Sequence, residues 1–160
     1  TAESLNPALH TRLIDGLYVE ALVMADEARA YFDREGAADK DRYDVMTRLS
    51  FTCESLKVTT RIMHVIAWLM TQKAWLRGEI TAQALADPKY RLAPAVETER
   101  NMLTLMPEGA RLLVVGSQSL YDRVLRLQER MAEPDSRESR LVQGGASPAL
   151  ELIGRLERSL

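Results

Sequence analysis

The fold that we predict for this chain is decided by residues 42–77, RYDVMTRLSFTCESLKVTTRIMHVIAWLMTQKAWLR. This segment contains neither Gly nor Pro, and apolar or small residues recur in it at alternating intervals of four and three. These residues are Leu49, Cys53, Leu56, Thr60, Met63, Ala67, Met70 and Ala74. The spacing is typical of a helix that packs lengthwise against other helices. At about 1.5 Å per residue the helix would be on the order of 50 Å long, and we therefore expect it to be the long axis of an elongated bundle.

The second half of this helix is apolar in nearly every direction. Between Ile62 and Met70 the one interruption is His64. A helix that is apolar all round has to be buried all round, and a second subunit would cover it more easily than one hairpin and a third helix. We therefore expect a homodimer whose interface includes Ile62, Ile66 and Leu69. The alternative is that this segment is the thick middle of a monomeric bundle.

Two further helices are indicated. The first is expected from Pro7, after an Asn that can cap it, to Arg34. Its apolar positions are Ile14, Leu17, Ala21, Met24, Ala28 and Tyr31. The other begins at Pro107, and its apolar stripe is Leu113, Ser117, Leu120, Val124, Leu127 and Met131. The short turn at 36–40 favours an antiparallel hairpin between the first two helices.

The connection between the second and third helices, residues 79–106, is long and irregular. Thr81 is placed to cap one short helix, and prolines at 88 and 94 interrupt the rest. A connection of this length is often functional, although it is also what a chain needs to return to the other end of a long bundle. The prediction is thus an all-α, antiparallel three-helix bundle with a long connection between its second and third helices.

The end of the chain has a different composition. We predict a helical bundle domain at 1–132, a flexible linker at 133–147 that is rich in Gly, Ser and charged residues, and an amphipathic segment at 148–160. Leu152, Ile153 and Leu156 share one face of that segment, and we expect this face to contact a partner. An ordinary docked C-terminal helix is the competing interpretation.

Composition limits the classes of function. The net charge of −2 gives no general attraction to nucleic acid or to an anionic membrane surface. The longest apolar run, Val65 to Met70, is far shorter than the ~20 residues needed to cross a bilayer. The N-terminus lacks the features of a signal peptide, and the single cysteine fits a reducing compartment. We therefore expect a cytoplasmic protein with no membrane insertion and no nucleic-acid partner.

No motif for catalysis, metal binding or cofactor binding is found. Cys53 and His64 share a helix face but stand about 16 Å apart, too far for a nucleophile and its base. Cys53 is interpreted as a small core residue and His64 as a packed or partly exposed one. The expectation is a protein that is not an enzyme, with no cofactor and no metal.

Two segments resemble a known family. They are SLKVTTRIMHVIAWLMTQKAWLRGEIT (Ser55 to Thr81) and SLYDRVLRLQ (Ser119 to Gln128). The most distinctive residues are Ser55, Thr59, Thr60, Arg61, Trp68, Leu69, Gln72, Gly78 and Glu79. The pattern resembles the RcdA family of alphaproteobacterial regulators of CtrA degradation, long described as a family of unknown function, over about residues 10–130.

The resemblance implies a homodimeric three-helix bundle that acts as an adaptor in cell-cycle proteolysis. Such an adaptor joins the ClpXP protease, primed by a response-regulator-like partner, to cargo such as the transcriptional regulator CtrA, or to a further adaptor. Recruitment to the cell pole is implied as well. The alternatives are a generic dimeric helical scaffold with no link to proteolysis, a small-ligand-binding protein with a pocket near His64 and Trp68, and a DNA-binding protein.

Overall fold

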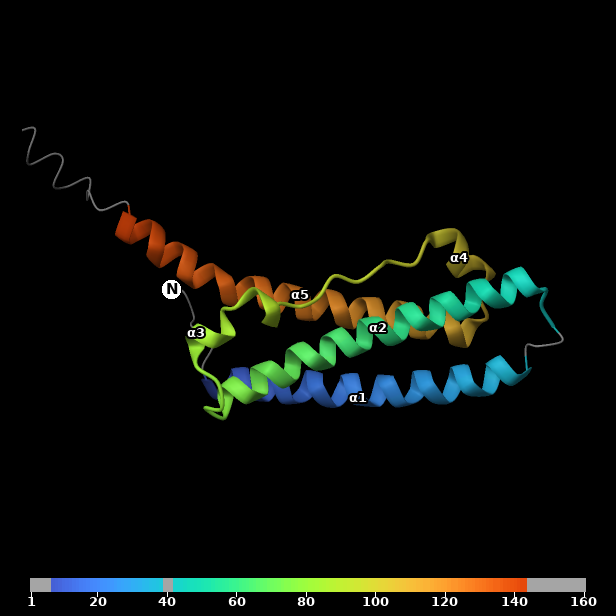
Figure 1. The fold of residues 1–160 in the computed structure, drawn as a ribbon, viewed down its shortest axis with the longest axis horizontal. Coiled ribbons are helices and arrows are strands. Elements are labelled where there is room, and N and C mark those ends of the chain that lie inside the picture. Colours follow the sequence, from blue (N-terminus) through green and yellow to red (C-terminus); the bar gives the residue numbers. More distant parts are fainter. Residues whose placement is uncertain (1–6, 39–41, 144–160) are drawn as a thin grey trace, which may run out of the picture. The chain divides into compact units, whose positions relative to one another are not determined.

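The computed structural model describes residues 7–38 and 42–143, with side chains described as far as residue 132 except at positions 36 and 37. All regular structure in these residues is helical, which confirms the predicted all-α class. Three long helices are present: α1 (Pro7–Ala38), α2 (Val45–Leu76) and α5 (Glu108–Gln143). The connection from α2 to α5 contains α3 (Ala82–Leu85), the 3-10 helix η2 (Pro88–Tyr90) and α4 (Arg100–Leu105), as Figure 1 shows.

The chain divides into two compact units, residues 1–125 and 126–160, and α5 runs from the first into the second. In the first unit α1 and α2 form an antiparallel hairpin, and the connection returns lengthwise so that α5 runs in the same direction as α2 (Figure 1). All three helices meet in one core cluster. Its buried members are Ala28, Val58, Ile62, Met106, Ala110 and Val114.

Local sequence signals set the ends of α2. The Asp44 carboxylate accepts a hydrogen bond of 2.7 Å from the backbone N–H of Thr47, which satisfies a donor in the first turn. Gly78 follows the helix with φ of +75°, a conformation that glycine adopts without steric cost. The N–H of Gly78 donates to Trp75 O, and that of Glu79 donates to Ala74 O. The helix therefore ends where the sequence predicted.

The apolar stripes of α1 and α5 point inward, but that of α2 does not. Ile14, Leu17 and Ala21 of α1 are buried, as are Leu120 and Val124 of α5. On α2 the predicted stripe faces outward, so its interpretation as the buried seam, with Cys53 as a core residue, was wrong. The buried residues of α2 are Glu54, Val58, Arg61, Ile62, Val65, Trp68, Leu69 and Gln72.

The buried face of α2 has the same helical spacing as the outward stripe. Its main positions, 54, 58, 61, 65, 68 and 72, also alternate between four and three. Three of these six residues are Glu54, Arg61 and Gln72, which are rarely buried unless they have partners. The helix thus carries two parallel stripes. The polar residues of the inner stripe make it difficult to identify from the sequence as the buried face.

Arg61 explains how a charged side chain fits in this core. It is 2% exposed, and Nη2 donates to the carbonyl oxygen of Val96 at 2.7 Å and to Thr98 Oγ1 at 2.8 Å. Nε also donates to Val96 O, and Nη1 donates to Ser117 Oγ at 3.3 Å. Burial lowers the pKa of Arg61, while the negative charge of Glu54 acts in the opposite direction. One guanidinium therefore joins α2, α5 and the irregular segment 92–99.

Glu54 completes this network from one side. Thr98 Oγ1 donates to Glu54 Oε2 at 2.6 Å, and Lys57 Nζ lies 2.8 Å from Glu54 Oε1. The buried carboxylate therefore has both a hydroxyl donor and a cation. Further along the segment, the Tyr121 hydroxyl donates to Ala93 O at 2.7 Å. Backbone carbonyls of a segment without regular structure need such partners when they pack against a core.

The helix beginning after Pro107 is longer than predicted. We expected the linker to begin at Glu133, but α5 continues to Gln143 and includes Pro134. Proline in a helix interior costs about 3 kcal/mol but does not forbid the helix. The predicted division into bundle, linker and terminal segment stays a prediction, and residues 144–160 lie outside the described part.

We predict that Arg61→Met lowers the free energy of unfolding by about 3 to 5 kcal/mol, because it leaves buried oxygens of two segments, 92–99 and α5, without their donor. Urea unfolding followed by circular dichroism measures this. Arg12→Met is the matched control, since Arg12 is exposed on α1, and it should change stability by less than about 0.5 kcal/mol. An Arg61 variant that unfolds at the wild-type urea concentration would contradict the role given to this network.

Two helical glycines give opposite predictions on substitution by alanine. A Cβ on Gly16 of α1 would meet nothing within 4 Å, so Gly16→Ala should stabilise the protein by up to about 1 kcal/mol through helix propensity. A Cβ on Gly109 of α5 would collide with the ring of Tyr31, and Gly109→Ala should destabilise by about 1 to 3 kcal/mol. Thermal unfolding of both variants tests the pair, and equal shifts in one direction would refute the close approach of α5 to Tyr31.

Candidate protein-interaction surfaces

The outward face of α2 is a continuous stripe of exposed apolar side chains. Its large members, Leu49, Leu56, Met63 and Met70, stand seven residues apart and are 55% to 63% exposed. The smaller residues between them, Cys53, Thr60 and Ala67, are exposed too. We call these seven residues the α2 stripe. The spacing is that of a coiled-coil seam, and the described helices of the first unit leave this seam exposed.

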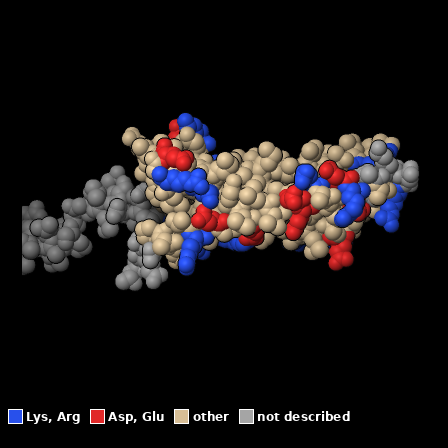
Figure 2. Space-filling model, turned by 90° about the horizontal axis from the view of Figure 1, so that it is seen from below, with Lys and Arg blue, Asp and Glu red and all other residues tan. Residues whose placement is uncertain are grey.

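Few charged residues lie in the middle of this region. Between Lys57 and Lys73, α2 carries one charged residue, the buried Arg61. Between Asp15 and Asp26, α1 carries one, Glu20, which forms an ion pair with Arg123 of α5. Figure 2, which views the molecule from the α1 side, shows charged side chains gathered at two places with an uncharged stretch between them. Such a surface favours contact with another protein.

A groove between α1 and α2 lies beside the stripe. It has a volume of about 340 Å³, and its lining includes Ala25 and Phe32 of α1 and Thr59, Ile62 and Met63 of α2. Met63 therefore belongs both to the stripe and to the edge of the groove. A partner that covers the stripe also meets this groove.

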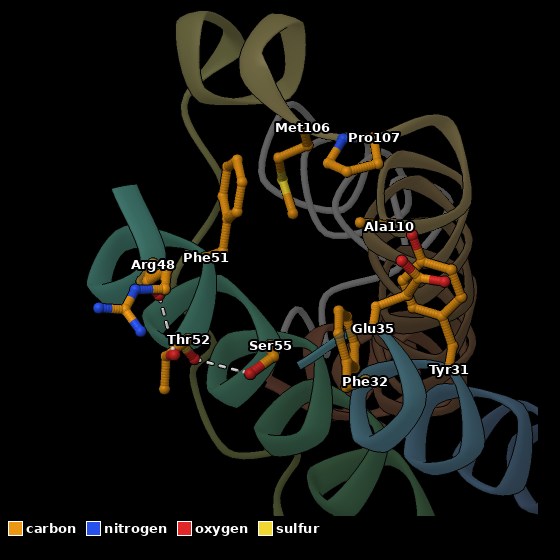
Figure 3. A pocket seen from close by; sticks show the side chains of 10 residues that line it. All are labelled: Tyr31, Phe32, Glu35, Arg48, Phe51, Thr52, Ser55, Met106, Pro107 and Ala110. Atoms are coloured by element: carbon orange, nitrogen blue, oxygen red, sulfur yellow. Dashed lines mark hydrogen bonds between the residues drawn. The ribbon is translucent and has the colours of Figure 1, made fainter. Parts of the chain in front are cut away.

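A second cavity, of about 270 Å³, opens near the turn between α1 and α2. We call it the aromatic pocket. It is lined by Tyr31, Phe32, Glu35, Arg48, Phe51, Thr52, Ser55, Met106, Pro107 and Ala110, shown in Figure 3. Helices α1 and α2 supply the three rings, and the start of α5 with the two residues before it supplies the aliphatic wall. Its size suits one side chain of a partner better than a drug-sized ligand.

The residues predicted for the dimer interface lie in different environments. Ile62 is 2% exposed and belongs to the core cluster, and Leu69 is fully buried. Ile66 is half-buried and packs against the same cluster. Ile62 and Leu69 are therefore already buried within one chain. The interface assignment itself remains untested, and so does the terminal face of Leu152, Ile153 and Leu156, which lies outside the described residues.

Sequence reasoning missed the aromatic pocket and the polar network. The pocket brings together residues from three separate segments, and no spacing within one segment marks it. Two adjacent aromatics, Tyr31 and Phe32, at the end of one helix and Phe51 near the start of the next were the available signal. Glu54 and Arg61, seven residues apart on one face of the helix, were the signal for the network.

The described part of the chain does not bring together a set of metal ligands. No group of three or more His, Cys, Asp or Glu residues there could hold a metal ion. His10 is buried against the ring of Trp75, and burial lowers its pKa. Trp68 is buried, and neither it nor His64 lines the groove or the pocket. None of the described helices is long and apolar enough to span a bilayer.

Comparison with known proteins supports the family resemblance. Residues 5–160 match the family described as "Protein of unknown function (DUF1465)". The crystal structure of RcdA from Caulobacter crescentus CB15 is similar at 33% sequence identity and a TM-score of 0.59, covering 74% of this chain and 90% of the other. A search among curated proteins finds no match. The chain therefore belongs to the DUF1465 family, of which RcdA is a member, and is RcdA-like as its sequence predicted.

Proposed function

We propose that this protein is a non-enzymatic adaptor in regulated proteolysis, which joins the primed ClpXP protease to cargo such as the regulator CtrA. The observation that carries the proposal is the 33% identity to RcdA over 74% of the chain. The described surfaces agree with such a role, because they offer apolar stripes and pockets for protein contact and no assembled catalytic group. The expected partners are ClpXP, its response-regulator-like priming partner, and transcriptional regulators or a further adaptor as cargo.

The proposal includes a homodimer, for which the α2 stripe is a better interface than the residues inferred from the sequence. Ile62 and Leu69 are already buried within one chain. The stripe instead presents apolar side chains at coiled-coil spacing with no exposed charge from 58 to 72. A second copy of the chain would bring a stripe of the same length and character, which removes both from water.

We predict that Met63→Glu converts the dimer into a monomer. Met63 is 63% exposed in the single chain, so the glutamate does not disturb the core, but in the dimer it would be buried without a partner. The dissociation constant should rise by about a hundredfold or more. Sedimentation velocity over a range of concentrations measures the change.

Leu112→Glu is the matched control for this experiment. Leu112 is 66% exposed on α5, outside the α2 stripe, and the substitution introduces the same charge. It should leave the dimer intact. If both variants remain dimeric, or both dissociate, the interface does not lie on the stripe.

The adaptor role is tested by reconstituted degradation with purified ClpXP, the priming partner and CtrA as cargo. We expect cargo to disappear faster when this protein is added, and only when the priming partner is present. A variant lacking residues 148–160 should deliver less cargo while keeping its melting temperature, because we propose that Leu152, Ile153 and Leu156 contact a partner. Loss of folding on this deletion would make the terminal segment structural.

The competing proposal is a dimeric helical scaffold with no link to proteolysis. It predicts the same oligomeric state and the same unfolding behaviour, but no effect on the lifetime of several cargos. An unchanged degradation rate with folded, dimeric protein would therefore favour the scaffold. The adaptor proposal also places the protein in the cytoplasm with recruitment to the cell pole, where a fluorescent fusion would be seen.

A further inference from the structure

The aromatic pocket combines two kinds of wall. Tyr31, Phe32 and Phe51 supply three aromatic rings, while Met106, Pro107 and Ala110 supply aliphatic surface. Phe51 is held edge-to-face against Tyr43, with ring centroids 5.0 Å apart, and Phe32 against Tyr31 at 5.4 Å. These contacts fix the rings before any ligand arrives, so that little order has to be gained on binding.

One carboxylate belongs to the same cavity. Glu35 lies one helical turn after Tyr31 on α1, so the two side chains share a face of the helix. The Glu35 side chain is 31% exposed, and its ion pair among the described residues is with Arg34, at 3.7 Å between Oε1 and Nε. Arg34 itself is 71% exposed, so this pair is long and screened by solvent. The negative charge at the cavity is therefore only weakly compensated.

Arg48 also borders the pocket, but no ion pair joins it to Glu35 in the described part of the chain. In Figure 3 its guanidinium points away from Met106, Pro107 and Ala110, so that its stem rather than its charge faces the cavity. Its backbone carbonyl accepts a hydrogen bond from Thr52 Oγ1 at 2.9 Å. Tyr31 already has a cation near its ring, because Arg34 Cζ lies 5.9 Å from the ring centroid. Cations are thus compatible with the aromatic side of this region.

We propose that the aromatic pocket binds a lysine or arginine side chain of a protein partner. The aliphatic stem of such a residue packs on Met106, Pro107 and Ala110, and its charged end meets the aromatic rings and the Glu35 carboxylate. A purely apolar side chain would strip water from Glu35 without replacing it. An acidic side chain would meet the like charge of Glu35. This site is independent of the proposed role in proteolysis.

The test uses the full chain labelled at methionine and alanine methyl groups, with Met106 and Ala110 as reporters in nuclear magnetic resonance spectra. The probes are acetyl-Gly-Ser-Lys-Ser-Gly-amide and two matched peptides in which norleucine or glutamate replaces lysine. Norleucine keeps the four-carbon stem and removes the charge. We expect the lysine peptide to shift both methyl signals saturably, the norleucine peptide to bind about fivefold more weakly, and the glutamate peptide to bind least.

Two variants distinguish the contribution of the Glu35 charge to binding from that of the cavity walls. Glu35→Gln should weaken binding of the lysine peptide by about threefold and bring it closer to that of the norleucine peptide, the remaining difference being the attraction of the cation to the rings. Glu27→Gln removes the same charge from an exposed position two turns earlier on α1 and should change nothing. The inference is overturned if norleucine or glutamate binds as well as lysine, if Glu35→Gln has no effect, or if the lysine peptide shows no saturable shift up to about 20 mM.

Discussion

The burial of Arg61 is the constraint on which the rest of the first unit depends. A guanidinium that is 2% exposed requires hydrogen-bond acceptors, and here they are the carbonyl of Val96 and the hydroxyls of Thr98 and Ser117. The Glu54 carboxylate, which accepts from the Thr98 hydroxyl, adds a negative charge nearby. Arg61 of α2 is thereby joined to α5 and to the irregular segment 92–99. The connection between α2 and α5 therefore packs against the bundle as part of its core rather than as a loose crossing. Breaking the network would leave charge and carbonyl groups buried without partners, which is costlier than losing apolar contacts of similar area.

This polar core also determines which face of α2 is free. The helix carries two stripes with the same four-three alternation, and only one of them can face α1 and α5. The inner stripe contains Arg61, whose hydrogen bonds can be made only from inside the bundle. The more uniformly apolar stripe of Leu49, Leu56, Met63 and Met70 is consequently left outside. An apolar stripe that is left exposed in this way is suited to association with another protein. Covering it gains hydrophobic free energy without disturbing the fold of the chain.

The sequence predicted the helices well and the orientation of one of them wrongly. Hydrophobic period and capping residues located the three long helices, since these signals are local and each acts within a few residues. The run LeuLeuValVal at 112–115 is helical, although its paired β-branched residues favour a strand locally. The facing of α2 could not be obtained in this way, because hydrophobicity favours the stripe that ended outside. The aromatic pocket could not be predicted from the sequence for a related reason. Phe32, Phe51 and Met106 come together only after the helices have packed.

The α2 stripe and the aromatic pocket would contribute differently to partner binding, the first through contact area and the second through selectivity for charge. The stripe offers area and a helical spacing, but its leucine and methionine side chains discriminate poorly among apolar partners. The pocket offers little area, but three fixed rings and an incompletely compensated carboxylate discriminate between a cationic and a neutral side chain. Phe32 and Ser55 line both the pocket and the groove beside the stripe, so the two surfaces adjoin on the same pair of helices. A chain that presents broad apolar contact next to a charge-selective pocket can hold one partner and still choose the other, and joining two proteins requires both abilities.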